Sequence, residues 1–172
     1  DLARLLLDSG ADARLASSNG VSPMYIAAER GHAQVVQLLI QHAQLDPNLA
    51  RPDGSTPLFP AVQNNHVQTV QVLLRAGANP NASKRDTNAT PLFTAAASGY
   101  VEVVKLLLHH GANVNTTRKD GARAIHAAAA QGHASVIQVL VEQRDCELEP
   151  KYQGRPPSEI AQLRQQDAIF SL

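Results

Sequence analysis

The sequence predicts an all-α repeat solenoid, a fold in which short helical units stack side by side. Two observations support this prediction: one segment recurs at a fixed period, and each recurrence has the pattern of two short helices. Equivalent positions are 34, 34, 33 and 33 residues apart, at Pro23, Pro57, Pro91, Ala124 and Pro157. A period of this length is typical of a solenoid, because one unit can bury its apolar face only against its neighbours.

The first helix of each unit is predicted by a cap residue followed by proline. Ser22, Thr56 and Thr90 each offer a side-chain oxygen to the unpaired amides at a helix start, and proline at the next position has no amide to satisfy. About eight residues later comes a residue that tolerates a left-handed backbone and ends the helix. These residues are Gly31, Asn65, Gly99 and Gly132.

The second helix follows directly and carries a run of Val, Leu and Ile on its predicted core face. These runs are residues 35–40, 70–74, 103–108 and 136–141. Gly77 and Gly111 end this helix in two units, whereas His42 and Arg144 stand in that place in two others. We therefore expect a non-glycine residue in the left-handed conformation at His42 and Arg144. The polar segment that leads to the next unit contains Gly and Asp, which predicts a hairpin-like finger.

The composition predicts a core of small aliphatic side chains and an intracellular protein. Of the 172 residues, 44% are hydrophobic but only 3% are aromatic, so Ala, Val, Leu and Ile must fill the core. The single cysteine cannot form an internal disulfide, and no apolar run reaches the ~18–20 residues that span a membrane. We expect the cytoplasm, with the nucleus as the alternative. The 15 basic and 15 acidic residues balance, which disfavours a nucleic-acid partner.

Several short motifs resemble the ankyrin repeat. They are Thr56-Pro57-Leu58 and Thr90-Pro91-Leu92, the Gly31-His32 and Gly132-His133 pairs, the Val-Val-x-Leu-Leu runs, and the Gly-Ala-Asn-Val-Asn segment at 111–115. The resemblance covers nearly the whole chain. It implies an ankyrin-repeat solenoid of stacked helix-turn-helix units, with β-hairpin fingers projecting at one edge.

On this resemblance, we interpret residues 1–172 as a single, monomeric ankyrin-repeat domain. The expected bounds are 1–17 for a partial N-terminal repeat, 18–50, 51–84, 85–117 and 118–150 for four repeats, and 151–172 for a partial C-terminal repeat. The partial repeats lead us to expect a piece of a larger protein.

The residues that could carry chemistry lack the partners it requires, so we expect neither an enzyme nor a cofactor. His109 and His110 are adjacent and do not share a helix face, and Cys146 has no base near it in sequence. No phosphate-binding loop, zinc-binding motif or pair of catalytic carboxylates is present. For the recurring histidines His32, His66 and His133, the resemblance implies a structural role in which they bridge backbone groups of neighbouring units.

Basic residues recur in the same register of successive fingers. The aligned residues are Arg51, Lys84 or Arg85, Arg118 and Lys151, with Lys119 and Arg155 extending the row and Asp53, Asp86 and Asp120 diluting it. Two interpretations stay open. Exposed fingers collect Lys and Arg for solubility, or the row forms a ridge that steers and orients an acidic peptide.

The resemblance implies a contact surface made of the finger tips and the ends of the first helices. Besides the charged finger residues, the positions that it marks are Asn19, Glu29, Arg30, Ser55, Gln63, Asn64, Ser98, Gln131 and Tyr152. Asn48, Asn81 and Asn115 occupy the loop position that asparaginyl hydroxylases modify in some ankyrin repeats, so we expect them as candidate modification sites.

These features predict a non-catalytic protein–protein interaction module that presents this surface to a protein or peptide partner, with neither nucleic acid nor a membrane as partner. The alternative is a substrate-recruiting or autoinhibitory ankyrin segment of a larger enzyme, channel, ubiquitin-ligase adaptor or bacterial effector.

Overall fold

The computed structural model describes residues 2–147 and residue 157, and in this part of the chain it contains nine α-helices and no β-strand. The helices are α1 (Leu2–Asp8), α2 (Pro23–Glu29), α3 (Ala33–Gln41), α4 (Leu58–Gln63), α5 (Val67–Arg75), α6 (Pro91–Ala97), α7 (Val101–His109), α8 (Ala124–Gln131) and α9 (Ala134–Val141).

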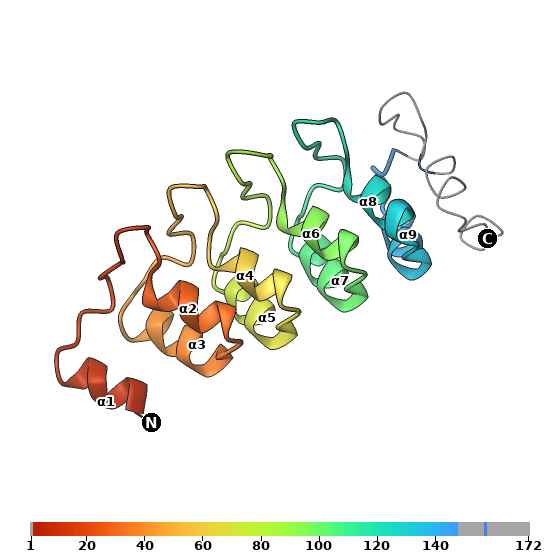
Figure 1. The fold of residues 1–172 in the computed structure, drawn as a ribbon. Helices are drawn as coiled ribbons and strands as arrows, with labels where there is room; N and C mark the ends of the chain where they lie inside the picture. The colour runs from red at the N-terminus through yellow and green to blue at the C-terminus, as the bar shows by residue number, and fades with distance from the viewer. Residues whose placement is uncertain (1, 148–156, 158–172) are drawn as a thin grey trace.

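Four helix pairs stack side by side after a single leading helix (Figure 1). The first helices of the pairs, α2, α4, α6 and α8, form one layer, and α1, α3, α5, α7 and α9 form the second. Neighbouring pairs contact each other within both layers, as α4 does with α6 and α5 with α7. The loops between pairs project to one side as fingers. The predicted all-α solenoid is confirmed.

A single hydrophobic core runs through all four pairs. The second helices contribute valines such as Val36, Val70, Val103 and Val136, which have no exposed surface. The first helices contribute alanines that are equally buried: Ala28, Ala61, Ala95, Ala96, Ala128 and Ala129. Short side chains let adjacent first helices approach closely, so the units share one core. This confirms the small aliphatic core predicted from composition.

The predicted N-caps form in two units but fail in the unit between them. The Ser22 hydroxyl accepts a hydrogen bond from the Tyr25 amide at 3.2 Å, and the Thr90 hydroxyl accepts one from the Phe93 amide at 3.2 Å. The prediction is wrong for Thr56, whose buried hydroxyl has no hydrogen-bond partner among the described residues.

Pro60 is the cause of the missing cap. In the neighbouring units, the amides of Ile26 and Thr94 donate to the carbonyl of the cap residue four positions earlier, at 3.1 Å in each case. Pro60 occupies that place in α4 and has no amide to donate. The Phe59 amide therefore donates to the Thr56 carbonyl, at 3.0 Å, and not to the Thr56 hydroxyl.

The predicted left-handed residues follow the first helices. Their φ angles are +75°, +55°, +74° and +78° at Gly31, Asn65, Gly99 and Gly132. The prediction is wrong for His42, which has a φ of −91°, and for Arg144, which is not left-handed. In the loop after α3, Gln44 is left-handed in place of His42, with a φ of +50°.

One extra residue in the loop after α3 moves the left-handed position. The Leu45 amide reaches back six residues to the Leu39 carbonyl, at 3.2 Å, whereas the matching Ala78 amide reaches back five residues to Leu73, at 2.9 Å. The turn closed by the Leu45–Leu39 hydrogen bond is one residue longer, so its left-handed residue comes one position later, at Gln44.

The predicted β-hairpins are not confirmed, because the described residues contain no strand. Each finger is instead a tight turn closed by backbone hydrogen bonds. The four turns are the first finger (17–21), the second (51–55), the third (84–89) and the fourth (118–122). In the second, the Arg51 amide donates to the Ser55 carbonyl at 2.9 Å; in the third, which is one residue longer, the Lys84 amide donates to the Ala89 carbonyl at 3.0 Å. These bonds align Lys84, and not Arg85, with Arg51.

Candidate protein-binding surface

Basic residues at the start of three fingers lie on aromatic rings of the preceding unit. The distances to the ring centres are 5.1 Å for Arg51 on Tyr25, 5.6 Å for Lys84 on Phe59 and 4.8 Å for Arg118 on Phe93. The three rings occupy equivalent positions in α2, α4 and α6, so we call these pairs the cation–ring ladder. A cation is attracted to the face of an aromatic ring, and each pair therefore ties a finger to the preceding first helix.

Two cations of the ladder are also paired with a carboxylate of their own finger. The Arg51 guanidinium lies 3.6 Å from the Asp53 carboxylate, and Arg118 lies 3.4 Å from Asp120. The Arg51 guanidinium also donates to the Tyr25 hydroxyl at 3.3 Å, and this hydrogen bond raises the pKa of Arg51 above its ordinary value. The side chains of Arg51 and Arg118 are only 25% and 30% exposed, so both guanidinium groups interact mainly with other groups of the protein.

Two further basic residues join consecutive fingers. The Arg85 guanidinium donates to the Pro52 carbonyl in the second finger at 3.0 Å, and the Lys119 ammonium donates to the Arg85 carbonyl in the third at 2.6 Å. The Arg85 amide also donates to the Asp53 carbonyl at 2.8 Å. The basic row thus holds the fingers together as well as presenting charge.

Asp53 closes its own finger through Ser55. The Asp53 carboxylate accepts hydrogen bonds from the Ser55 amide, at 2.9 Å, and from the Ser55 hydroxyl. Burial opposes the charged form, but these bonds and the nearby charges of Arg51 and Lys84 outweigh it and lower the pKa of Asp53. Ser55 itself is 1% exposed, so the structure places this predicted contact residue inside the finger.

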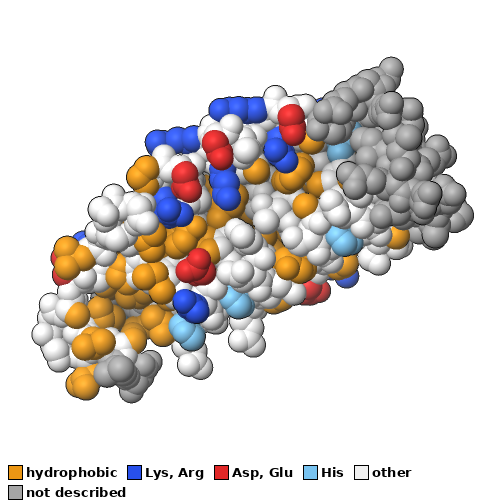
Figure 2. All heavy atoms as spheres, viewed as in Figure 1, with side chains coloured by type: hydrophobic (Ala, Val, Ile, Leu, Met, Phe, Trp, Pro, Cys, Tyr) orange, Lys and Arg blue, Asp and Glu red, His pale blue; other side chains and the backbone are white. Residues whose placement is uncertain are grey.

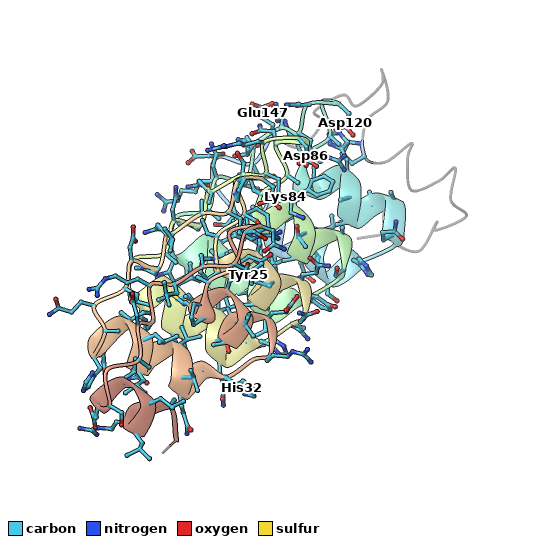
Figure 3. All side chains as sticks on the ribbon, turned by 60° about the vertical axis from the view of Figure 1, so that its left-hand side comes forward. Tyr25, His32, Lys84, Asp86, Asp120 and Glu147 are labelled. Carbon is cyan, nitrogen blue, oxygen red and sulfur yellow. The ribbon has the colours of Figure 1, made fainter. Side chains whose placement is uncertain are left out.

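Most of the other predicted contact residues are exposed. We use the name contact face for these twelve: Asn19, Glu29, Arg30, Asp53, Gln63, Asn64, Arg85, Asp86, Ser98, Lys119, Asp120 and Gln131. Figure 2 shows basic and acidic side chains alternating along the fingers. Figure 3 shows Lys84, Asp86 and Asp120 in succession along the finger edge, with His32 at the opposite edge of the stack. The finger edge therefore carries both signs of charge.

Finger residues and helix-end residues meet in one hollow of about 440 Å³. Gln63 and Ser98 line it from the ends of α4 and α6, while Lys84, Asp86 and Arg118 line it from the third and fourth fingers. The two parts of the predicted surface are therefore continuous at this place.

Two of the three recurring histidines, His66 and His133, bridge neighbouring units, as the resemblance implied; for His32 the described structure shows no such bond. The ring Nε2 of His66 lies 3.0 Å from the Glu29 carbonyl, and that of His133 lies 3.1 Å from the Ala97 carbonyl. The Asn64 side-chain amide adds a donor to the Glu29 carbonyl at 3.0 Å. These bonds satisfy carbonyls that a helix end leaves unpaired.

The loop asparagines link successive units, and we call Asn48, Asn81 and Asn115 the asparagine ladder. The Asn81 side chain donates to the Gly111 carbonyl at 2.9 Å and accepts from the Asn113 amide at 2.8 Å. Asn48 and Asn115 make the same pair of bonds to the loops that follow them. All three side chains therefore hold the stack together.

The other residues considered for chemistry are His109, His110 and Cys146. His109 is exposed and packs edge-to-face with His110 at the end of α7. Burial raises the pKa of the Cys146 thiol, which disfavours the reactive thiolate. Within residues 2–147 and 157, no group of three or more His, Cys, Asp or Glu side chains is arranged to hold a metal ion. Nor does any helix described here have the length and apolar character needed to cross a membrane.

Three predicted contact residues, Lys151, Tyr152 and Arg155, lie outside the described residues. Sequence reasoning also missed the aromatic half of the cation–ring ladder. The signal was present, because Tyr25, Phe59 and Phe93 recur 25 or 26 residues before the basic finger residues. The sequence alone could not distinguish a ring that packs in the core from one that also receives a cation.

A family model described as ankyrin repeats, in three copies, matches residues 1–84, 53–118 and 81–152. A search of curated proteins found no match. The matched segments overlap and together cover most of the sequence.

Proposed function

The chain belongs to the ankyrin-repeat family, whose repeats are generally protein–protein interaction modules, and on that basis we propose that it binds a protein or peptide partner through the contact face. The exposure of the contact face is the observation that carries this proposal. The side chains of Gln63, Ser98 and Gln131 form no hydrogen bond or ion pair in the described structure and lie at the ends of the first helices of three units. A rigid scaffold that holds such free side chains in a row reduces the ordering cost of binding.

The test uses peptides selected from a random-peptide library displayed on phage. They are selected on the whole chain and then measured against two triple variants. Gln63→Arg, Ser98→Arg and Gln131→Arg alter the contact face. Gln37→Arg, Gln68→Arg and Gln138→Arg make the same charge change at exposed positions on the second helices.

We expect the contact-face variant to lose at least about tenfold in affinity, because three bulky charges would lie in the interface. The second-helix variant should bind like the unchanged chain. Circular dichroism and thermal unfolding check that both variants are folded. If the peptides bind both variants equally, or lose affinity only for the second-helix variant, the proposal is wrong.

A further inference from the structure

The two residues at the end of each first helix, which are exposed or half-buried, differ in size from unit to unit. They are Glu29-Arg30, Gln63-Asn64, Ala97-Ser98 and Ala130-Gln131. The third pair has the smallest side chains, and the hollow of about 440 Å³ lies over it, with Ala97 and Ser98 in its lining. This hollow of the contact face therefore lies where its side chains are shortest, whereas a second hollow, of about 540 Å³, is lined by the polar residues Glu29, Arg30, Asn64 and His66.

The floor of this hollow is partly apolar. Ala89, Phe93 and Ala97 line it, and each is half-buried, so some apolar surface remains in contact with water. Covering such surface stabilises a complex by about 25 cal/mol per Å², and a bulky side chain in a central pocket commonly dominates binding. The hollow suits one bulky apolar side chain.

Positive charge exceeds negative charge around the same hollow. Lys84, Arg118 and Asp86 line it, and the third and fourth fingers to which they belong hold four basic and two acidic residues: Lys84, Arg85, Arg118 and Lys119, against Asp86 and Asp120. Arg118 is already paired with Asp120 at 3.4 Å, and the Asp86 carboxylate accepts from the Thr87 amide at 2.7 Å.

Lys84 differs from the other basic residues of the fingers. Arg51 and Arg118 are paired with carboxylates, and Arg85 and Lys119 donate to backbone carbonyls. Within residues 2–147 and 157 the Lys84 ammonium has neither kind of partner and lies on the Phe59 ring at 5.6 Å. A carboxylate from outside could approach this ammonium without displacing an internal one, which makes Lys84 the point of charge complementarity on the contact face.

We propose that the hollow over Ala97 and Ser98 takes a bulky apolar side chain of a bound peptide segment, while Lys84 binds an Asp or Glu carboxylate of the same segment. This inference rests on the proposed function and adds the chemistry of the partner. The sequence suggested a ridge that attracts acidic peptides along its length. The present proposal narrows this hypothesis to one carboxylate site beside one apolar site.

The selected peptides should therefore contain Asp or Glu close to Phe, Trp, Leu or Ile. Synthetic copies of these peptides are the probe. Lys84→Met keeps the methylene stem on the Phe59 ring and removes only the charge, and Ser98→Trp fills the hollow from an exposed position. Lys105→Met on α7 and Ser135→Trp on α9 make matched changes at exposed positions outside the lining.

We expect Ser98→Trp to weaken binding at least about tenfold and Lys84→Met about three- to tenfold. The two control variants should bind like the unchanged chain. Replacing the acidic residue of the peptide by its amide should remove the effect of Lys84→Met, because the two changes delete the same interaction in a double-mutant cycle.

The results separate this inference from the function on which it rests. Two outcomes overturn the inference and leave the proposed function intact. In the first, the peptides lose affinity for the triple variant at Gln63, Ser98 and Gln131 but contain no acidic residue. In the second, they bind Lys84→Met as tightly as the unchanged chain. A carboxylate that couples to Lys119 and not to Lys84 also overturns the inference. Peptides indifferent to the contact face overturn both. Thermal unfolding of Lys84→Met and Ser98→Trp confirms that any loss reflects binding.

Discussion

At the scale of single residues, Gly99 lies against the ring of His133 from the next unit. A Cβ atom at Gly99 would lie 2.7 Å from that ring, and its φ of +74° disfavours any other residue. Gly31 and His66 repeat this arrangement, whereas the corresponding pair in the unit between them is Asn65 and Tyr100. The left-handed glycine therefore provides space for the histidine as well as a helix end.

We predict that Gly99→Ala lowers the free energy of unfolding by about 2–4 kcal/mol, the sum of left-handed strain and overpacking. Gly111→Ala is the control, because Gly111 has a φ of +85° but no atom of the described residues lies within 4 Å of an added Cβ. That variant should lose only about 1–2 kcal/mol from strain. Urea unfolding measures both. Equal losses would mean that contact with His133 contributes nothing.

Asp53 should make stability depend on pH. Its pKa is lowered in the folded protein, so its carboxylate stabilises the fold above the unfolded-state pKa of about 3.9, and this contribution is lost as the pH falls through the folded-state pKa. The stability difference between the unchanged chain and Asp53→Asn should be largest near neutral pH and shrink below about pH 4. Ser55→Ala, which removes one donor, should flatten this dependence. A difference that grows in acid would contradict the assignment.

At the scale of helices and fingers, the cation–ring ladder connects each finger to the unit before it. Phe93 lies in α6 and Arg118 begins the fourth finger, so their 4.8 Å contact crosses a unit boundary. The planar guanidinium of Arg118 can stack on the ring, which the Lys84 ammonium cannot do.

We predict a coupling free energy of about 0.5–1 kcal/mol between Arg118 and Phe93. The measurement is urea unfolding of Arg118→Met, Phe93→Leu and the double variant. Arg75→Met and the double variant Arg75→Met with Phe93→Leu provide the control, since Arg75 is exposed at the end of α5 and makes no ring contact in the described structure. Additive effects of Arg118→Met and Phe93→Leu would show that the contact is incidental.

Sequence reasoning predicted the elements whose cause lies within one unit. The proline starts, the glycine ends and the apolar faces of the helices are local signals, and the structure confirms them. Three local predictions were wrong. Pro60 removes the donor that sets up the Thr56 cap, the extra residue after α3 makes Gln44 left-handed in place of His42, and Arg144 is not left-handed.

Contacts between units were harder to predict. The contact residues were placed by resemblance, and most are exposed, but Ser55 is turned inward to Asp53. The pairing of Arg51 with Tyr25 and the hollow over Ala97 and Ser98 depend on how one unit sits on the next. A single sequence gives the period of the repeat but not that geometry.

At the scale of the whole molecule, stability is distributed along the stack. Each unit contacts its neighbours, so the free energy of the solenoid is approximately a sum of unit terms and interface terms. The asparagine ladder contributes to three successive interfaces through paired side-chain bonds. Breaking one rung should therefore weaken one interface and leave the others.

We predict that Asn81→Ala weakens the interface between the α4–α5 and α6–α7 pairs, because Asn81 follows α5 and its partners Gly111 and Asn113 follow α7. The change removes the bonds to the Gly111 carbonyl and the Asn113 amide, at about 0.5–1.5 kcal/mol each. Asn79→Ala is the control, because the Asn79 side chain bonds to the Asn81 amide within its own loop. Native-state hydrogen exchange should show faster opening of α6 to α9, the helices beyond that interface, in Asn81→Ala but unchanged protection in α2 and α3. A uniform loss of protection along the stack would mean that the ladder supports one cooperative unit, and that the interfaces do not fail separately.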